Sequence, residues 1–252
     1  MFRPRVIPVL LLKGQGLVKT VQFAKHRYIG DPINAVRIFN DLEVDELVFL
    51  DILASRENRT ISIDIVKQIG DEAFMPFAVG GGIKTSKDAL ALISAGAEKV
   101  ILNTAFVENP RIVNEIAALI GNQSVVVSID VKKNWFGIYQ AFSKGGLEKV
   151  VETPIDLAMK AEELGAGEII INSISNDGMM QGYDLELIQQ ITSAVNIPVV
   201  ACGGAGKLIH LREGTNKGAH AVAAGSLFVY HGARNAVLIN YPEKKELINN
   251  FS

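Results

Sequence analysis

The sequence is poor in the residues that build covalent or metal frameworks. Its 252 residues include one cysteine, Cys202, and four histidines. A single cysteine excludes a disulfide framework within the chain, and a reducing cytoplasm is the expected compartment. The histidines lack the spacing of metal ligands, so we expect no metal and no other cofactor. They are His26, His210, His220 and His231.

The chain also lacks a strong charge of either sign and a long hydrophobic run. Its net charge of −2 gives no electrostatic argument for binding nucleic acid or an anionic membrane. The apolar run near the N-terminus stops at Lys13 and Gly14, too early to span a membrane, and it lacks a small-residue cleavage site. With 48% hydrophobic residues, we predict a soluble cytoplasmic protein with one domain over residues 1–252.

Short, nearly continuous apolar runs alternate with helical patterns along the chain, as is typical of parallel strands buried on both faces. The predicted strands are Val6–Leu12, Glu46–Asp51, Pro76–Gly80, Lys99–Asn103, Ser124–Asp130, Glu168–Ser173, Pro198–Ala201 and Ala219–Ala223. The predicted helices are Pro32–Leu42, Ile61–Ile69, Ser86–Ala95, Pro110–Ile120, Pro154–Leu164, Leu185–Ala194 and Leu208–Asn216. Asp31 and Asn109 each precede a proline, where they can cap a helix. The alternation predicts either a (β/α)8 barrel or a doubly wound sheet.

An internal repeat favours the barrel. Segment 46–51 resembles 168–173, segment 76–82 resembles 198–204, and segment 96–104 resembles 218–226, all at the same offset of 122 residues. Two halves of four βα units suit a closed eight-stranded barrel, whereas a doubly wound sheet gives no reason for such a repeat. Chance similarity among apolar strands is the alternative. We therefore predict an α/β fold, a single (β/α)8 TIM barrel with an internal half-barrel repeat.

Two matching groups of small residues follow strands on the face where barrel active sites form. The first group is Gly80, Gly81 and Gly82 with Asn103 and Thr104, and the second is Gly203 and Gly204 with Gly225 and Ser226. Glycine lets backbone N–H groups approach a phosphate closely, and the hydroxyl groups can donate further bonds. The sequence thus predicts two phosphate sites on opposite sides of one mouth. Tight strand–helix turns are the alternative.

Asp130 ends the fifth predicted strand at the same face, where a carboxylate can act as general acid or base. A structural cap or an ion pair with Lys132 is the alternative. Segment 125–132 aligns with segment 6–13, which makes Leu11 the counterpart of Asp130. A site with paired carboxylates would need an acid at position 11.

Two further segments can contribute to this mouth. Asp177 and Gly178 follow the sixth strand and indicate a turn, with or without a polar ligand contact. The loop Lys132–Thr153 is predicted to be a mobile lid, and Leu17–Tyr28 a second flexible loop. Within the latter, Lys19 is either a phosphate ligand or a solvated surface charge.

Four charged residues stand at the starts of strands one, two, four and six: Arg5, Glu46, Lys99 and Glu168. If these side chains point inward, charges of alternating sign meet at the N-terminal mouth. They must then pair, because an unpaired buried charge is costly. Such a cluster either stabilises the barrel or forms a gate, and the sequence does not separate the two.

Taken together, these residues resemble HisF, the cyclase subunit of imidazole glycerol phosphate synthase, over nearly the whole chain. The most specific matches are Gly30–Pro32, Asp45–Asp51, Val79–Ile83, Asn103–Ala105, Glu108–Pro110, Asp177–Gly178, Gly182–Asp184 and Cys202–Gly206. The resemblance implies a HisA/HisF-like, ribulose-phosphate-binding barrel with a HisH-type glutaminase at its N-terminal face. In that family, ammonia passes through the barrel and attacks an open-chain intermediate with two phosphates. The products are imidazole glycerol phosphate and an aminoimidazole carboxamide ribotide.

The resemblance also implies roles for single residues. It assigns the ammonia gate to Arg5, Glu46, Lys99 and Glu168. It assigns phosphate binding to Gly82, Asn103, Thr104, Asp177, Gly178, Gly203, Gly204, Gly225 and Ser226, with Lys19 and Asp51 as further ligand contacts. Asp130 matches one of two catalytic aspartates.

The second aspartate is missing. The family pattern Cys-Leu-Asp-Val-Lys-Asp-Gly-Arg corresponds here to Val9–Gly16, with Leu11 at the catalytic position. Leucine cannot transfer a proton, and such groups typically contribute about 10²–10⁴-fold in rate. Pro8, Leu10–Lys13 and Gly16–Thr20 are similar to HisF paralogues of surface-polysaccharide gene clusters, the WbuZ or glycosyl amidation-associated proteins. These are thought to supply ammonia to an amidotransferase that makes acetamidino sugars of lipopolysaccharide.

Three hypotheses therefore stand. The chain is an ammonia-channelling HisF paralogue that acts with a glutaminase and a sugar amidotransferase. Alternatively, it is a working cyclase of histidine biosynthesis in which another acid, Asp51 or Asp177, replaces the missing aspartate. The third hypothesis is a non-enzymatic barrel that only docks and activates a glutaminase.

Overall fold

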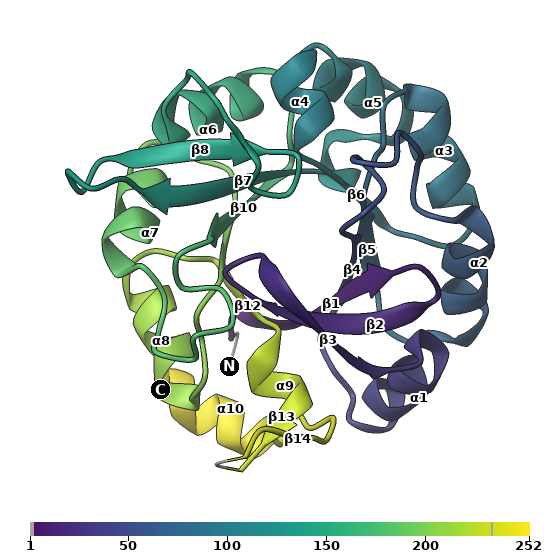
Figure 1. The fold of residues 1–252 in the computed structure, drawn as a ribbon, viewed down its shortest axis with the longest axis vertical. Coiled ribbons are helices and arrows are strands. Elements are labelled where there is room, and N and C mark those ends of the chain that lie inside the picture. The colour runs from purple at the N-terminus through teal and green to yellow at the C-terminus, as the bar shows by residue number, and fades with distance from the viewer. Residues whose placement is uncertain (1–2, 233) are drawn as a thin grey trace.

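The computed structural model describes residues 3–232 and 234–252. Eight parallel strands form its centre: β1 (Arg5–Lys13), β4 (Leu47–Asp51), β5 (Phe77–Gly80), β6 (Lys99–Leu102), β7 (Val125–Lys133), β10 (Glu168–Ser173), β11 (Val199–Cys202) and β12 (Ala221–Ala224). Neighbouring strands pair in chain order, and the pairing of β10 with β7 closes the sheet. The predicted (β/α)8 barrel is confirmed, with each of the eight strands in the predicted place (Figure 1).

Helices surround the barrel on its outside (Figure 1). They are α1 (Pro32–Asp41), α2 (Ile63–Glu72), α3 (Ser86–Ser94), α4 (Thr104–Glu108), α5 (Ile112–Ile120), α6 (Pro154–Glu163), α7 (Leu185–Thr192), α8 (Leu208–Asn216), α9 (Ser226–Val229) and α10 (Lys244–Phe251), with a 3-10 turn at Asn122–Ser124. Asp31 caps α1 as predicted, because its side chain accepts a hydrogen bond from the backbone N–H of Asn34. The predicted cap at Asn109 is wrong, since Asn109 ends α4 and α5 begins only at Ile112.

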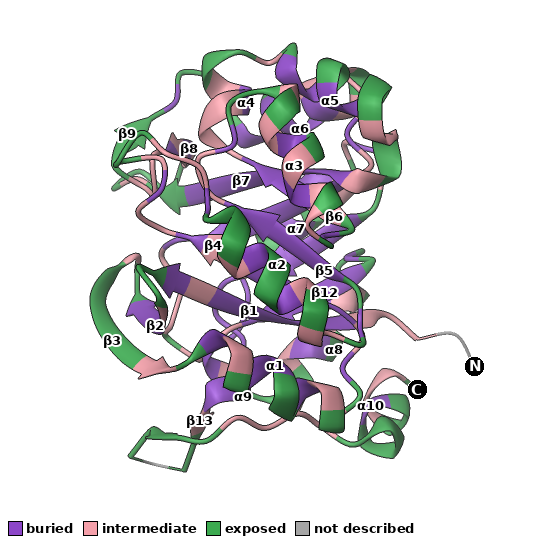
Figure 2. Cartoon of the chain, turned by 90° about the vertical axis from the view of Figure 1, so that its right-hand side faces the viewer, coloured by how far each residue is buried: buried purple, intermediate pink, exposed green. Residues whose placement is uncertain are grey.

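The strands separate two apolar regions. Residues that point outward pack against the inner faces of the helices and form the larger core, whereas inward residues fill the barrel. The inward set is Ile7, Val9, Val48, Ala78, Ile101, Val126, Ile170, Val200, Ala221 and Ala223. Side chains alternate between these two regions because successive residues of a strand face opposite sides. Figure 2 shows the resulting pattern, with buried strands and helices whose outer faces are exposed.

Both loops that the sequence predicted to be flexible contain strands instead. Segment Leu17–Tyr28 forms most of a hairpin, β2 (Gly16–Val21) and β3 (Ala24–Gly30), which continues from β1. In segment Lys132–Thr153, β7 continues to Lys133 and pairs with β8 (Tyr139–Ser143), which pairs with β9 (Glu148–Lys149). Two short strands, β13 (Tyr230–His231) and β14 (Ala236–Val237), pair near the C-terminus. Both segments therefore form hairpins beside the barrel mouth, and their mobility stays a prediction.

Candidate functional site

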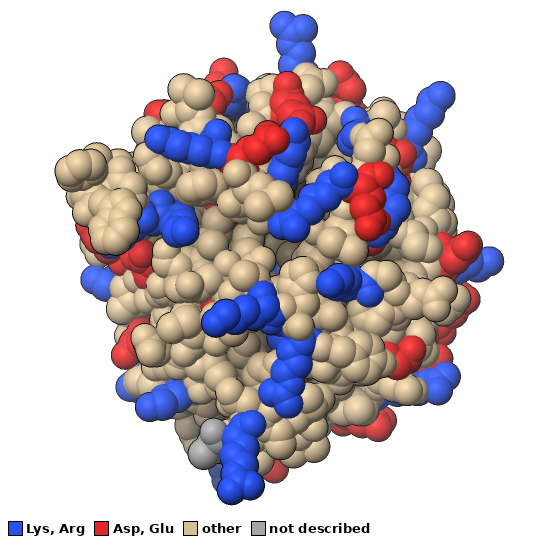
Figure 3. Space-filling view, in the orientation of Figure 1, with Lys and Arg blue, Asp and Glu red and all other residues tan. Residues whose placement is uncertain are grey.

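A cavity of about 330 Å³ opens at the C-terminal ends of the barrel strands. Lysine and arginine side chains surround a hollow on this face (Figure 3), and Lys19, Arg56, Lys84 and Lys144 line the cavity. Its walls differ in character. The wall at β1 and β4 presents Val9, Leu11, Val48 and Leu50, whereas the wall at β6, β7 and β10 presents Asn103, Ser128, Asp130 and Asn172.

The first glycine group lies at one side of this cavity, as the sequence predicted. Gly81 and Gly82 have φ angles of +127° and +65°, and a Cβ on Gly82 would overlap the backbone oxygen of Arg59. Only glycine fits a backbone of this shape. The Thr104 hydroxyl accepts a hydrogen bond from the backbone N–H of Lys144 at 3.2 Å and lies 3.4 Å from Asn103 Oδ1. The β8–β9 loop therefore contacts this group directly.

The second glycine group lies across the cavity together with Lys19, which the sequence left undecided between ligand and surface. Lys19 is only 4% exposed, and its ammonium group donates to the backbone oxygen of Val9. Gly225 adjoins this ammonium so closely that a Cβ would overlap it. Burial lowers the pKa of Lys19 to about 8, although the nearby Asp177 carboxylate opposes that shift. A buried cation therefore stands beside Gly225 and Ser226.

Asp130 lies between two amide side chains at the polar wall. Its Oδ1 accepts from Asn172 Nδ2 at 3.2 Å, and its Oδ2 accepts from Asn103 Nδ2 at 3.3 Å. Burial raises the pKa of Asp130 to about 7, while the Asn172 hydrogen bond acts in the opposite direction. A carboxyl group with a pKa near neutrality can both release and take up a proton. Leu11 lies on the apolar wall and supplies no such group.

Asp177 lines the cavity, and its carboxylate is also bonded to the β2–β3 hairpin. Its Oδ2 accepts from the Thr20 hydroxyl at 2.8 Å and from the backbone N–H of Phe23 at 3.3 Å. The backbone N–H of Gln22 also donates to the Asp177 carbonyl at 2.9 Å. Burial raises the pKa of Asp177. The residue thus fixes the β2–β3 hairpin against the barrel, and Gly178 contacts the same hairpin at Thr20.

Asp51 is also occupied by protein groups. Its carboxylate forms an ion pair with Arg59 at 2.5 Å and accepts from the backbone N–H groups of Leu53 and Ala54. It still lines the cavity, together with Ile52. Asp51 therefore organises the β4–α2 loop rather than standing free as an acid.

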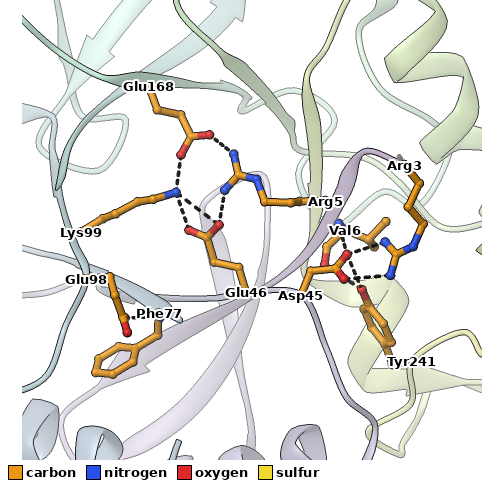
Figure 4. A network of polar contacts seen from close by, with 10 residues as sticks. All are labelled: Arg3, Arg5, Val6, Asp45, Glu46, Phe77, Glu98, Lys99, Glu168 and Tyr241. Carbon is orange, nitrogen blue, oxygen red and sulfur yellow. Dashed lines mark hydrogen bonds and ion pairs between the residues drawn. The ribbon is translucent and has the colours of Figure 1, made fainter. Parts of the chain in front are cut away.

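At the opposite end of the barrel the four charged residues point inward and pair with one another, as predicted (Figure 4). Arg5 bonds both Glu46 and Glu168, and Lys99 bonds the same two carboxylates at 3.0 and 2.9 Å. The glutamate side chains are only 4% and 7% exposed. Beside this ring, Asp45 accepts from Arg3, the Val6 backbone and Tyr241, which ties the chain termini to the barrel.

Several site residues were missed by the sequence argument, namely Thr20, Arg59 and Asn172. Asn172 gave no signal because its repeat counterpart is Leu50, and Thr20 lay in a segment predicted to be a loop. In the described part of the chain no cluster of three histidine, cysteine or acidic residues could hold a metal ion. The described helices also include none that is long and apolar enough to cross a bilayer.

Comparisons with known proteins agree with this architecture. A family model described as histidine biosynthesis protein matches residues 5–234. The chain is 50% identical to a Pseudomonas aeruginosa protein over 98% of this chain and 99% of that one, and 47% identical to a Leptospira interrogans protein over 98% of each. The first is named putative imidazole glycerol phosphate synthase subunit hisF2, and the second putative imidazole glycerol phosphate synthase subunit HisF. Imidazole glycerol phosphate synthase subunit HisF of Exiguobacterium sibiricum is 44% identical over 90% of this chain and 91% of its own. The chain therefore belongs to the histidine biosynthesis protein family, in its HisF branch.

Proposed function

We propose that this chain is the synthase subunit of a glutamine amidotransferase. It takes ammonia from a HisH-type glutaminase bound at the charged ring and delivers it to a phosphorylated ligand in the cavity. The observation that carries this proposal is the alignment of ring and cavity on the same strands. Both lie inside the barrel, at its two ends. The single reduced cysteine suits a cytoplasmic complex.

Only a short distance separates the ring from the cavity. Glu46, Lys99 and Glu168 are followed two residues later by Val48, Ile101 and Ile170, which line the cavity floor. Two residues of a strand span about 6.6 Å. Small displacements of these aliphatic side chains and of the ring would admit a molecule the size of ammonia. The apolar passage favours neutral ammonia over the ammonium ion.

The two glycine groups and Lys19 suit a ligand with a phosphate at each end. The buried ammonium of Lys19 forms one described hydrogen bond, to Val9, so an anion beside Gly225 would give it a counter-charge. Gly82 and Thr104 provide the matching group across the cavity. Gly203, Gly204 and Ser226 complete the group beside Lys19. The middle of such a ligand would lie between Leu11 and Asp130.

The chemistry at that central position is restricted by Leu11. The two acids that could replace the missing aspartate are engaged, Asp51 with Arg59 and Asp177 with Thr20 and Phe23. Among the carboxyl groups that line the cavity, Asp130 is the one held by amide side chains instead of an ion pair or the β2–β3 hairpin. We infer that histidine-pathway cyclisation is weak in this protein. Its ammonia serves another acceptor, an N-acetyl sugar that a sugar amidotransferase converts to an acetamidino sugar.

The second candidate is a working cyclase of histidine biosynthesis. It is favoured by the retained Asp130, whose pKa of about 7 suits acid–base chemistry, and by the relatives named as HisF subunits. In that case Asp130 would serve alone, by giving up and taking back a proton in successive steps.

The test compares the wild type with Leu11→Asp, each purified with its HisH-type glutaminase. The assay follows glutamate release and cyclisation of the open-chain histidine-pathway intermediate. We expect glutamine hydrolysis with slow cyclisation in the wild type, and cyclisation faster by about 10²–10⁴-fold in Leu11→Asp. Leu11→Asn is the matched control, because it is polar but cannot transfer a proton. A wild-type turnover of about one per second or faster would establish the second candidate instead.

A further inference from the structure

Within residues 3–232 and 234–252, one buried side-chain oxygen or nitrogen has no hydrogen-bond partner, the Oδ1 of Asn172. Asn172 lies on β10, in register with Asp130 on β7 and with Cys202 on β11. It is 9% exposed and lines the cavity. An unpaired buried acceptor is costly, and each such group in a folded protein calls for an explanation.

A half-turn of the Asn172 amide exchanges the positions of its oxygen and its nitrogen. Its Nδ2 now donates to Asp130 Oδ1. Gly203 lies on the other side of the amide. A Cβ added to Gly203 would be 2.8 Å from Asn172 Oδ1 and 2.6 Å from the backbone oxygen of Ser173. The Ser173 oxygen already accepts from the backbone N–H groups of Asn176 and Asp177, so it needs no donor from Asn172. A half-turn of the amide would direct its oxygen to Asp130 in place of its nitrogen.

That reversed orientation fits a protonated Asp130. A carboxylate only accepts hydrogen bonds, whereas a carboxylic acid has one O–H to donate. With Asp130 ionised, the nitrogen of Asn172 faces it. With Asp130 protonated, the O–H needs an acceptor, and Asn172 Oδ1 is the unoccupied one next to it.

Asn103, the other amide at Asp130, cannot reverse in this way. Its Nδ2 also donates to the backbone oxygen of Ser128 at 3.0 Å, and its Oδ1 accepts from the Thr104 hydroxyl at 3.4 Å. Reversal would place the Asn103 oxygen against the Ser128 oxygen. Asn103 is therefore fixed as a donor, and a donor binds the ionised form of Asp130 more strongly than the protonated form. The two asparagines provide a matched pair within one site.

We propose that Asn172 is a positioning residue that follows the protonation of Asp130, donating to its carboxylate and, after a half-turn of the amide, accepting from its carboxylic acid. The proton stays on Asp130 or goes to the ligand, and the amide never carries it. The charged group that acts on Asp130 is Asp177. The charged groups that act on the neighbouring Cys202 are Asp177, Asp130 and Lys19. Because the repeat counterpart of Asp130 is Leu11, a partner that suits both protonation states holds the Asp130 carboxyl group in place throughout.

The proposal is tested on the full-length wild type by NMR. The carboxyl ¹³C signal of Asp130 gives its pKa, and the side-chain amide signals of Asn172 and Asn103 are followed over the same pH range. We expect the Asn172 signals to shift with the midpoint of Asp130 and those of Asn103 to keep their orientation. Asp130→Asn should abolish the shift at Asn172. Asn172 signals that stay constant while Asp130 titrates would overturn the proposal, and this measurement needs no variant to fold.

Two leucine variants supply the second measurement. Asn103→Leu removes a donor to the carboxylate alone, so the pKa of Asp130 should rise by about one unit. Asn172→Leu removes a partner of both forms, so the pKa of Asp130 should rise by less than in Asn103→Leu. An equal rise in both variants would show that Asn172 is a simple donor and would refute the proposal. The outcome does not depend on which ligand or partner the protein uses, so it is independent of the function proposed above.

Discussion

Replacing Asp130 by asparagine should stabilise this protein, and increasingly so as the pH rises. Burial raises the pKa of Asp130 from its ordinary value of 3.8 to about 7. The folded protein therefore keeps a proton on this group, between about pH 4 and pH 7, that the unfolded chain has already released. Stability falls as the pH rises through that window, because the folded state binds more protons than the unfolded one.

The size of the effect follows from the two pKa values. One pKa unit corresponds to about 1.4 kcal/mol, so the free energy of unfolding loses about 2 kcal/mol by pH 5 and about 4 kcal/mol by pH 8. The substituted asparagine would carry no charge and would escape this loss. For a chain of this size, 1 kcal/mol changes Tm by about 2–4 °C. The advantage of Asp130→Asn in Tm should therefore grow by about 4–8 °C between pH 5 and pH 8.

The assay is thermal unfolding of both proteins from pH 5 to pH 8. Asp64→Asn is the control, because it makes the same substitution at an exposed carboxylate in the first turn of α2. A stability gain of Asp130→Asn that is the same at every pH would refute the reasoning. So would a carboxyl signal of Asp130 that is already ionised at pH 5.

Two further predictions concern the ends of the barrel. Lys99→Met should lower Tm by about 5–10 °C, because it leaves the buried carboxylates of Glu46 and Glu168 with Arg5 as their shared cation. The double variant Lys99→Met/Glu46→Gln should recover much of this loss in the same melting assay. Thr20→Val should speed hydrogen exchange at the amides of Gln22 and Phe23 about tenfold with little change in Tm, because it removes one hydrogen bond between the β2–β3 hairpin and Asp177. Thr20→Ser keeps the hydroxyl and should leave the exchange rate unchanged. Equal exchange rates in the two variants would contradict this role of the hydroxyl.

The elements that the sequence predicted well are those that local patterns determine. Buried parallel strands appear as apolar runs, and the charges at their starts, such as Glu46 and Lys99, face inward because they share the parity of the inward residues Val48 and Ile101. The β2–β3 hairpin was missed because its turn uses Gln22 and Phe23 at positive φ, without glycine or an Asn-Gly signal.

Burial of single polar residues was harder to predict because it depends on contacts between distant segments. Lys19 is buried only because its hairpin folds back over the mouth and brings the side chain to Val9 and Gly225. The bond between Asn172 and Asp130 depends on the register of β10 on β7, across 42 residues of sequence. A pattern with a period of two residues gives the direction of each side chain, but not its partner across the barrel.

The two half-barrels share the same arrangement of strands and helices, but they differ in the polar side chains at equivalent positions. The phosphate-type glycine groups recur in both halves, but Asp130 corresponds to Leu11, Asn172 to Leu50 and Ser128 to Val9. Every one of these replacements makes the β1–β4 wall apolar and leaves the donors and acceptors on β6, β7 and β10. A ligand anchored at both ends would therefore meet the Asp130 carboxyl group on one side and the Leu11 side chain at the equivalent position on the other. Ring closure that needs an acid and a base on opposite sides is poorly served by such a cavity. Release of ammonia onto a held ligand, or past it to a second enzyme, requires no group on the apolar wall.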